Sequence, residues 1–211
     1  MATLDAEHFK KSVELQGVGL TVIEFWGRIP KDILKGITSS QWREVYDCAA
    51  DSHSAKLVAF KRCIIGTSFS MAVAMHWSKL PTELLEQFTF DDWKEIVQYA
   101  PESQAKEYAK DKLIEKAVSF NQLLEIVTLL PCNDEKMATA LSKMKKDAEL
   151  PWEFVWIWLM SEDGSKERKE VEEKVKSLNV SLSEWNSAFK IAPKGSAIQS
   201  IIQEKIEMLF V

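Results

Sequence analysis

The stretch TFDDWKEIVQYAP, residues 89–101, decides the fold because it carries the start, the buried face and the end of one helix. Thr89 and Asp92 form the capping-box pattern, in which a hydroxyl and an acidic group three residues later bond free backbone N–H groups. Apolar residues then recur at helical spacing from Trp93 to Ala100. Pro101 ends the helix, since proline disfavours helical backbone in the residue before it.

The same frame recurs along the chain. Further copies are TSSQWREVYDCAA (38–50), SFNQLLEIVTLLP (119–131), LPWEFVWIWLMSE (150–162) and SLSEWNSAFKIAP (181–193). The residues equivalent to Trp93 are Trp42, Leu123, Phe154 and Trp185. From Trp93 onward these positions lie 30, 31 and 31 residues apart. The wider interval before Trp93 leaves room for one shortened copy from about Ser68, with Met71 at the equivalent position.

A second, more charged helix is expected after each first helix, as in ESQAKEYAKDKLIEKA (102–117) and DEKMATALSKMKKDA (134–148). Such a helical hairpin cannot bury its apolar face alone, so neighbouring copies must stack. The sequence therefore predicts an all-α, right-handed superhelical array of about five or six antiparallel helical hairpins over residues 38–211, with a period of 30–31 residues. Residues 1–37 do not fit the frame, and we expect an atypical N-terminal capping segment of the same domain.

This repeat resembles those of α-solenoid proteins in general, with a loose similarity to tetratricopeptide and HEAT arrays. Trp93 and Ile96 match the Trp-x-x-Leu opening of the tetratricopeptide repeat. Tetratricopeptide repeats differ in their longer period of 34 residues and in a glycine soon after the leucine. The resemblance implies stacked helical hairpins and indicates no particular family.

The composition argues against several classes of protein. Of the 211 residues, 46% are hydrophobic and 28% are charged, and the net charge of −5 disfavours general binding to nucleic acid or to an anionic membrane. The longest apolar run, residues 63–77, is shorter than the roughly 20 residues of a membrane-spanning helix. The three cysteines, Cys48, Cys63 and Cys132, suit reduced thiols. We therefore expect a cytoplasmic protein.

Three of the eight tryptophans lie in PWEFVWIWLM, residues 151–160. The other copies carry mostly polar residues on the helix face opposite the apolar stripe, as in Asp91, Lys94, Glu95 and Gln98. The same positions in this copy hold Trp152, Val155, Trp156 and Leu159. Trp158 matches a core position instead. The four residues are either buried by the chain itself or form a docking patch for another protein, because large exposed apolar patches mark interaction sites.

A similar apolar face occurs in the shortened copy, at Phe69, Ala72, Val73 and His76. There we expect burial, because the nearby N-terminal segment is apolar and needs a surface to cover.

No sequence pattern predicts catalysis, a metal site or a cofactor. His8, His53 and His76 lack metal-ligand spacing, and DSHS at residues 51–54 is expected to serve as a loop and helix cap. The acidic run of Glu83, Glu86, Asp91 and Asp92 is expected to be a solvated helix junction. Cys132 follows Pro131 at a helix start, and with no companion histidine it is expected to be unreactive.

These observations favour a non-catalytic scaffold or adaptor that binds a protein partner through one face of the array, at Trp152, Val155, Trp156 and Leu159. One alternative is a HEAT-like solenoid of the DNA glycosylase type. The balanced charge of residues 102–118 counts against this alternative, because a nucleic-acid groove needs a basic stripe. A second alternative is a structural protein that associates with itself as a homo-oligomer through the tryptophans.

Overall fold

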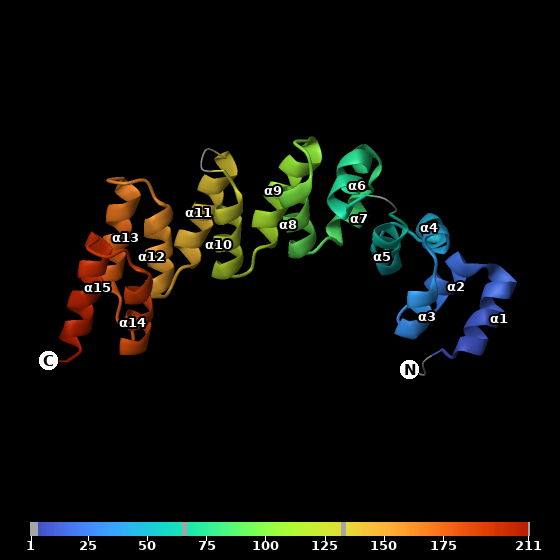
Figure 1. Cartoon of the computed structure of the whole chain (residues 1–211), viewed down its shortest axis with the longest axis horizontal. Helices are drawn as coiled ribbons and strands as arrows, with labels where there is room; N and C mark the ends of the chain where they lie inside the picture. Colours follow the sequence, from blue (N-terminus) through green and yellow to red (C-terminus); the bar gives the residue numbers. More distant parts are fainter. Residues whose placement is uncertain (1–3, 65–66, 132–133, 211) are drawn as a thin grey trace. The chain divides into compact units, whose positions relative to one another are not determined.

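The computed structural model describes residues 4–64, 67–131 and 134–210. All regular structure in these residues is helical, as the sequence predicts, and no strand occurs among them (Figure 1). The chain divides into two compact units, Met1–Lys112 and Leu113–Val211. Among the described residues, no helix combines the length and the apolar content needed to cross a bilayer.

The helices of the described part follow one another with short connections. In the first unit they are α1 (Ala6–Gln16), α2 (Val18–Glu24), α3 (Lys31–Gly36), α4 (Ser39–Cys48), α5 (Ser54–Cys63), α6 (Phe69–His76), the 3₁₀ helix η1 (Trp77–Lys79), α7 (Thr82–Glu86) and α8 (Phe90–Tyr99). Helix α9 (Gln104–Lys116) runs across the boundary between the units. In the second unit they are α10 (Phe120–Leu129), α11 (Glu135–Asp147), α12 (Pro151–Met160), α13 (Lys166–Ser177), α14 (Leu182–Ile191) and α15 (Ala197–Met208).

The expected helix starts are confirmed by the hydrogen bonds at their caps. Thr89 accepts a hydrogen bond from the backbone N–H of Asp92, and the Asp92 carboxylate accepts one from the backbone N–H of Thr89. The same reciprocal bonds occur at Thr38 and at Ser181. At Ser119 only one of the two bonds forms: the Ser119 hydroxyl accepts from the Gln122 backbone N–H. The Gln122 side chain accepts from the backbone N–H of Val118 instead of from that of Ser119.

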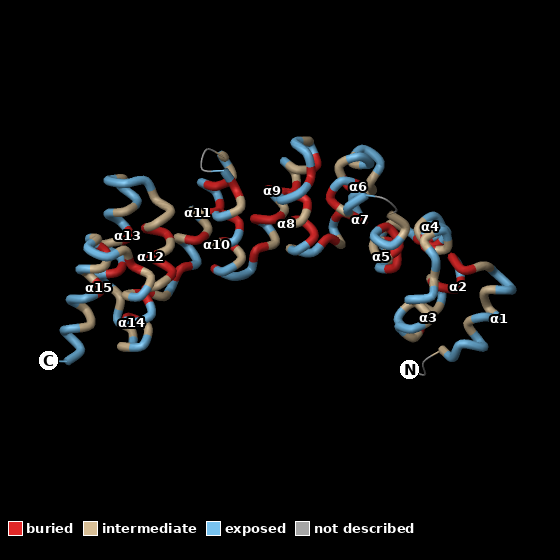
Figure 2. The backbone as a smooth tube through the Cα atoms, in the orientation of Figure 1, coloured by how far each residue is buried: buried red, intermediate tan, exposed pale blue. Residues whose placement is uncertain are grey.

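The residues equivalent to Trp93 in the four full-length copies are buried, as Trp93 is, which confirms the helix face assigned to each. Their exposed fractions are 3% for Trp42, 0% for Trp93 and Leu123, 4% for Phe154 and 2% for Trp185. Figure 2 shows buried positions recurring along the helices of both units. The apolar face expected for the second helices is buried too, since Ala109 and Met144 are fully covered.

The shortened copy departs from the expected register. Its helix α6 begins after the Ser68 cap as expected, but Met71 is 37% exposed and therefore does not occupy a core position. Helix α6 turns Ala72 and Val73 inward instead, and it packs against α8. Its successors are η1 and the five-residue α7, so no long second helix holds α6 in the register of the other copies.

The burial expected for the apolar face of α6 is confirmed for Ala72 and Val73, and it is wrong for the exposed His76. The N-terminal segment covers a different surface. Its Val18 and Val22 share a buried cluster with Trp42 of α4. At Gly19 the two helices approach so closely that a Cβ atom would lie 2.9 Å from the Cys48 Sγ.

Helices of the second unit pack with their sequence neighbours and with the next helix but one. Helix α12 contacts α11 and α13, and it also contacts α10 and α14. Helix α13 contacts α15 in the same way. Figure 1 shows α12 to α15 side by side. Helix α12 is therefore covered from several sides, which matters for its tryptophans.

Candidate functional site

The start of α12 differs from those of its siblings because no hydroxyl caps it. Pro151 occupies the first turn, where a missing N–H costs nothing. The Glu153 carboxylate accepts hydrogen bonds from the backbone N–H groups of Glu149 and Leu150, at 2.7 and 2.9 Å. These bonds satisfy the charge of a side chain that is only 8% exposed. The start of α12 is thus stabilised by groups other than Trp152, Val155, Trp156 and Leu159.

The four residues expected on the outer face of α12 do not share one environment. Val155 is fully buried, so burial by the chain itself, one of the two alternatives for this face, applies to Val155, and its assignment to a docking patch is wrong. Helix α12 packs against helices on several sides, and this packing covers a position that is open in α14, where Asn186 is exposed. Trp152, Trp156 and Leu159 remain partly exposed. We call these three residues the tryptophan surface.

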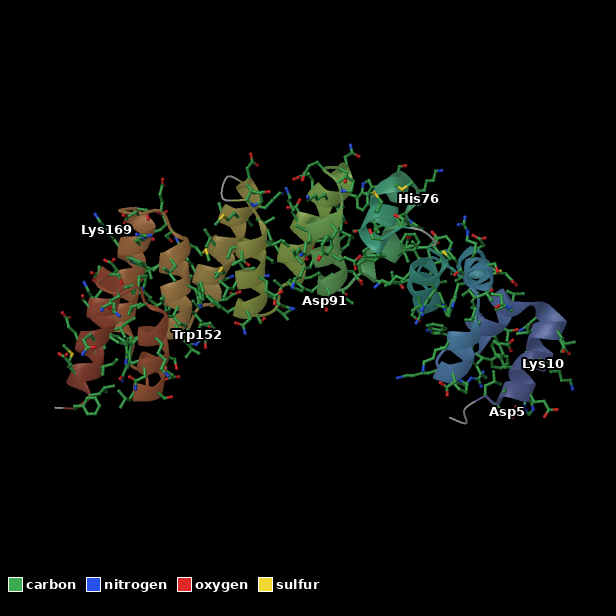
Figure 3. All side chains as sticks on the ribbon, viewed as in Figure 1. Asp5, Lys10, His76, Asp91, Trp152 and Lys169 are labelled. Carbon is green, nitrogen blue, oxygen red and sulfur yellow. The ribbon has the colours of Figure 1, made fainter. Side chains whose placement is uncertain are left out.

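Trp152 has a structural contact as well as an exposed part. Its ring meets that of Phe120 edge to face, with 5.3 Å between the ring centroids. Phe120 lies at the start of α10 and is 7% exposed. Figure 3 labels Trp152 on α12. Both interpretations of the sequence therefore apply to this residue in part: it covers a neighbour within the chain and still presents apolar area.

Trp158 belongs to the core, as expected, and connects α12 to α13. It is 9% exposed, and its Nε1–H donates to the Glu172 carboxylate at 2.9 Å. The Arg168 guanidinium lies 4.1 Å from the Trp158 ring centroid, a cation–π arrangement. The Arg168 Nε–H also donates to the carbonyl oxygens of Trp158 and Ser161. These bonds hold the far side of α12, leaving the tryptophan surface outside this network.

The equivalent positions of neighbouring first helices carry polar side chains. On α14, Ser187 stands where α12 has Trp156, and Lys190 stands where it has Leu159; both are exposed. On α10 the corresponding exposed residues are Glu125 and Thr128. The indole and isobutyl groups of α12 thus occupy positions at which α10 and α14 carry exposed polar residues. This arrangement can bind an apolar group while polar neighbours bond the rim of a partner.

The chemistry-bearing residues outside α12 have local structural roles. The Nδ1 atom of His53 accepts a hydrogen bond from the Ala55 backbone N–H, which confirms the expected cap in the DSHS stretch. His8 pairs with Asp5 at 2.6 Å, and Asp92 closes the capping box of α8. Cys132 lies outside the described residues.

No group of three or more His, Cys, Asp or Glu side chains that could hold a metal ion occurs within residues 4–64, 67–131 and 134–210. Comparison with protein-family models, with curated proteins and with solved structures found no match for this chain.

Proposed function

We propose that this protein is a non-catalytic scaffold or adaptor that binds another protein through the tryptophan surface, Trp152, Trp156 and Leu159. The observation that carries the proposal is the partly exposed position of Trp156 and Leu159, where α14 has exposed Ser187 and Lys190. A sibling helix is built without apolar residues at these positions, so the fold does not require them. Tryptophan is also prominent among residues that dominate binding energy, where one buried side chain contributes about 2 kcal/mol or more.

The proposal extends to the arrangement of the helices. We propose that the first and second helices form antiparallel hairpins that stack as an α-solenoid. Support comes from the 30–31-residue spacing of buried residues such as Trp93, Leu123 and Phe154, and from the contacts of α12 with α14 and of α13 with α15. Stacked hairpins present their first helices as one continuous face, the kind of extended surface that solenoids use for binding. A cytoplasmic location, with reduced cysteines, fits this proposal.

The test replaces the surface with residues that a sibling helix already uses. Trp156→Ser with Leu159→Lys gives α12 the side chains of α14 at these two positions. We expect the variant to keep its helicity and melting temperature, because both side chains are partly exposed. It should lose at least about 2 kcal/mol of partner affinity, a thirtyfold weakening. The readout is quantitative capture from a lysate of the native host with the tagged full chain.

The matched control is Lys169→Glu, a change to an exposed residue of α13 in the same unit (Figure 3). A protein captured by the parent and by this control but lost with the double variant supports the proposal. Equal capture by all three chains refutes it.

Self-association through the same surface gives a separate outcome. Light scattering of the parent at two concentrations would then show a concentration-dependent mass that the double variant lacks. The DNA glycosylase alternative receives less support, because the second helices pair their lysines with acids, as Lys106 does with Glu102. Salt-dependent binding of short DNA duplexes to the parent chain would favour that alternative over an adaptor.

A further inference from the structure

The first unit contains a pocket that plays no part in the proposed function. It has a volume of about 490 Å³ and lies among α4, α5, α6 and η1. Its apolar walls include Phe60 of α5, Ala72 of α6 and Leu80 after η1. The volume falls within the roughly 300–1,000 Å³ of pockets that hold small molecules. These apolar walls do not distinguish a ligand with a positively charged end group from one with a negatively charged end group.

The rim of this pocket is cationic. Arg43 of α4 and Lys79 of η1 supply the positive charges that line it, and His76 of α6, which Figure 3 labels, also lines it. Two acids lie close by. The Asp47 carboxylate is 3.5 Å from the Arg43 Nε, and the Asp51 carboxylate is 3.3 Å from the Lys56 Nζ. Because Lys56 balances Asp51, the charges of Arg43 and Lys79 together outweigh that of Asp47. A cationic rim on a chain with a net charge of −5 is a local departure from the average surface.

The two acidic groups inside the pocket stay neutral. Burial raises the pKa of the Tyr46 hydroxyl, with nearby Asp51 adding to the effect, and burial also raises the pKa of the Cys63 thiol. Both residues line the pocket, and the thiol donates to the Phe60 carbonyl oxygen at 3.4 Å. At neutral pH neither group offsets the cations at the rim, and the hydroxyl can donate a hydrogen bond to an anion.

We infer that this pocket binds a small organic carboxylate with an apolar body, the body against Phe60, Ala72 and Leu80 and the carboxylate between Arg43 and Lys79. Apolar walls select the body of the ligand, and the rim selects the sign of its charge. Inorganic phosphate leaves the walls unfilled, and an apolar amine of the same length meets like charge at the rim. Binding therefore requires both parts in one molecule.

The two described cysteines supply an internal readout. Cys63 lines the pocket, whereas Cys48 of α4 is exposed and does not line it. The full chain is treated with iodoacetamide in the presence of octanoate, octylamine or inorganic phosphate, and the alkylation rate of each cysteine is followed by peptide mass spectrometry. We expect saturating octanoate to slow alkylation of Cys63 severalfold and to leave Cys48 unchanged. Octylamine and phosphate should protect neither thiol.

Variants test the cationic rim directly. Arg43→Gln with Lys79→Gln should weaken octanoate binding about tenfold in calorimetry, the equivalent of one charge-assisted contact. Lys35→Gln, which removes an exposed charge of α3 away from the pocket, should bind octanoate as the parent does. Circular dichroism confirms that each variant is folded.

Three results would overturn the inference. The first is no protection of Cys63 by octanoate. The second is equal protection by octanoate and octylamine, which would mean that the rim does not select charge. The third is protection by phosphate alone, which would mean an anion site that does not use the apolar walls. None of these results bears on the tryptophan surface, which lies in the other unit.

Discussion

Replacement of Trp93 by alanine should destabilise the first unit by about 3–5 kcal/mol. Trp93 is fully buried, and its ring lies 4.9 Å from Phe88 and 5.8 Å from Tyr108. Burying an indole removes about 150–250 Å² from water, which at about 25 cal/mol per Å² stabilises the fold by about 4–6 kcal/mol. An opposing contribution comes from its Nε1–H, which is buried without an acceptor among the described residues.

This N–H separates two variants of Trp93. An unsatisfied buried donor costs about 1–3 kcal/mol, which Trp93→Ala recovers while leaving a cavity that costs more. Trp93→Phe also removes the donor but keeps one aromatic ring against Phe88 and Tyr108. We therefore expect it to cost less than half as much as Trp93→Ala.

Urea unfolding followed by circular dichroism at 222 nm gives these free energies, because helix content dominates the signal at this wavelength and, unlike fluorescence, it is not lost with the replaced indole. The control is Tyr99→Ala, which removes an aromatic residue that is 62% exposed from the same helix. It should change the free energy of unfolding by no more than about 0.5 kcal/mol. A Trp93→Ala variant within 1 kcal/mol of the parent would refute the assignment of Trp93 to the core.

Three further experiments compare variants whose expected effects follow from the surroundings of the replaced residues. Gly19→Ala should destabilise the protein by about 1–3 kcal/mol, because the added Cβ atom would press on α4. Gly36→Ala should stabilise it by about 0.4–1 kcal/mol, because no described atom lies within 4 Å of the added Cβ atom. Urea unfolding of both variants measures the difference. Hydrogen bonds from the Ser181 hydroxyl and backbone N–H hold the pKa of Glu184 below its usual 4.5. The stabilisation by these bonds is therefore present above pH 4.5, and it is lost as the pH falls through the lowered pKa. Ser181→Ala should raise that pKa in an NMR titration, and the stability gap to the parent should narrow below pH 4.5. Trp152→Asp should lower the melting temperature, because the Trp152 ring packs against Phe120. Trp156→Ser should leave the melting temperature nearly unchanged. Equal shifts of the two variants in a thermal scan would contradict this difference.

Local signals in the sequence predicted the helices well because caps and proline ends act within a few residues. Thr89, Ser181 and Pro101 needed no information from distant parts of the chain. Burial of the Trp93 equivalents was predictable for a related reason, since a recurring large apolar residue at one register must face the interior. Met71 was misassigned because the register of α6 depends on its packing against α8, which the local pattern does not encode.

The candidate site was predictable only in part. Comparison of the copies identified the unusual apolar face of α12, and Trp152, Trp156 and Leu159 are partly exposed there. It could not identify Val155 as buried, because the siblings carry Asn186 or Leu124 at that position and only the packing around α12 decides its exposure. The pocket of the first unit gave no signal, since Arg43 and Lys79 lie 36 residues apart in unrelated patterns.

Photo-crosslinking from position 156 tests the proposed docking function most directly. A photoreactive phenylalanine derivative replaces Trp156 in one chain and exposed Lys169 of α13 in another, and both are irradiated in a lysate of the native host. The proposal predicts a crosslinked protein of defined mass at position 156 alone, displaced by an excess of the parent chain. An adduct containing two copies of this chain would replace the adaptor with self-association. No adduct at position 156, or the same adducts at both positions, would contradict the claim that the tryptophan surface binds a partner.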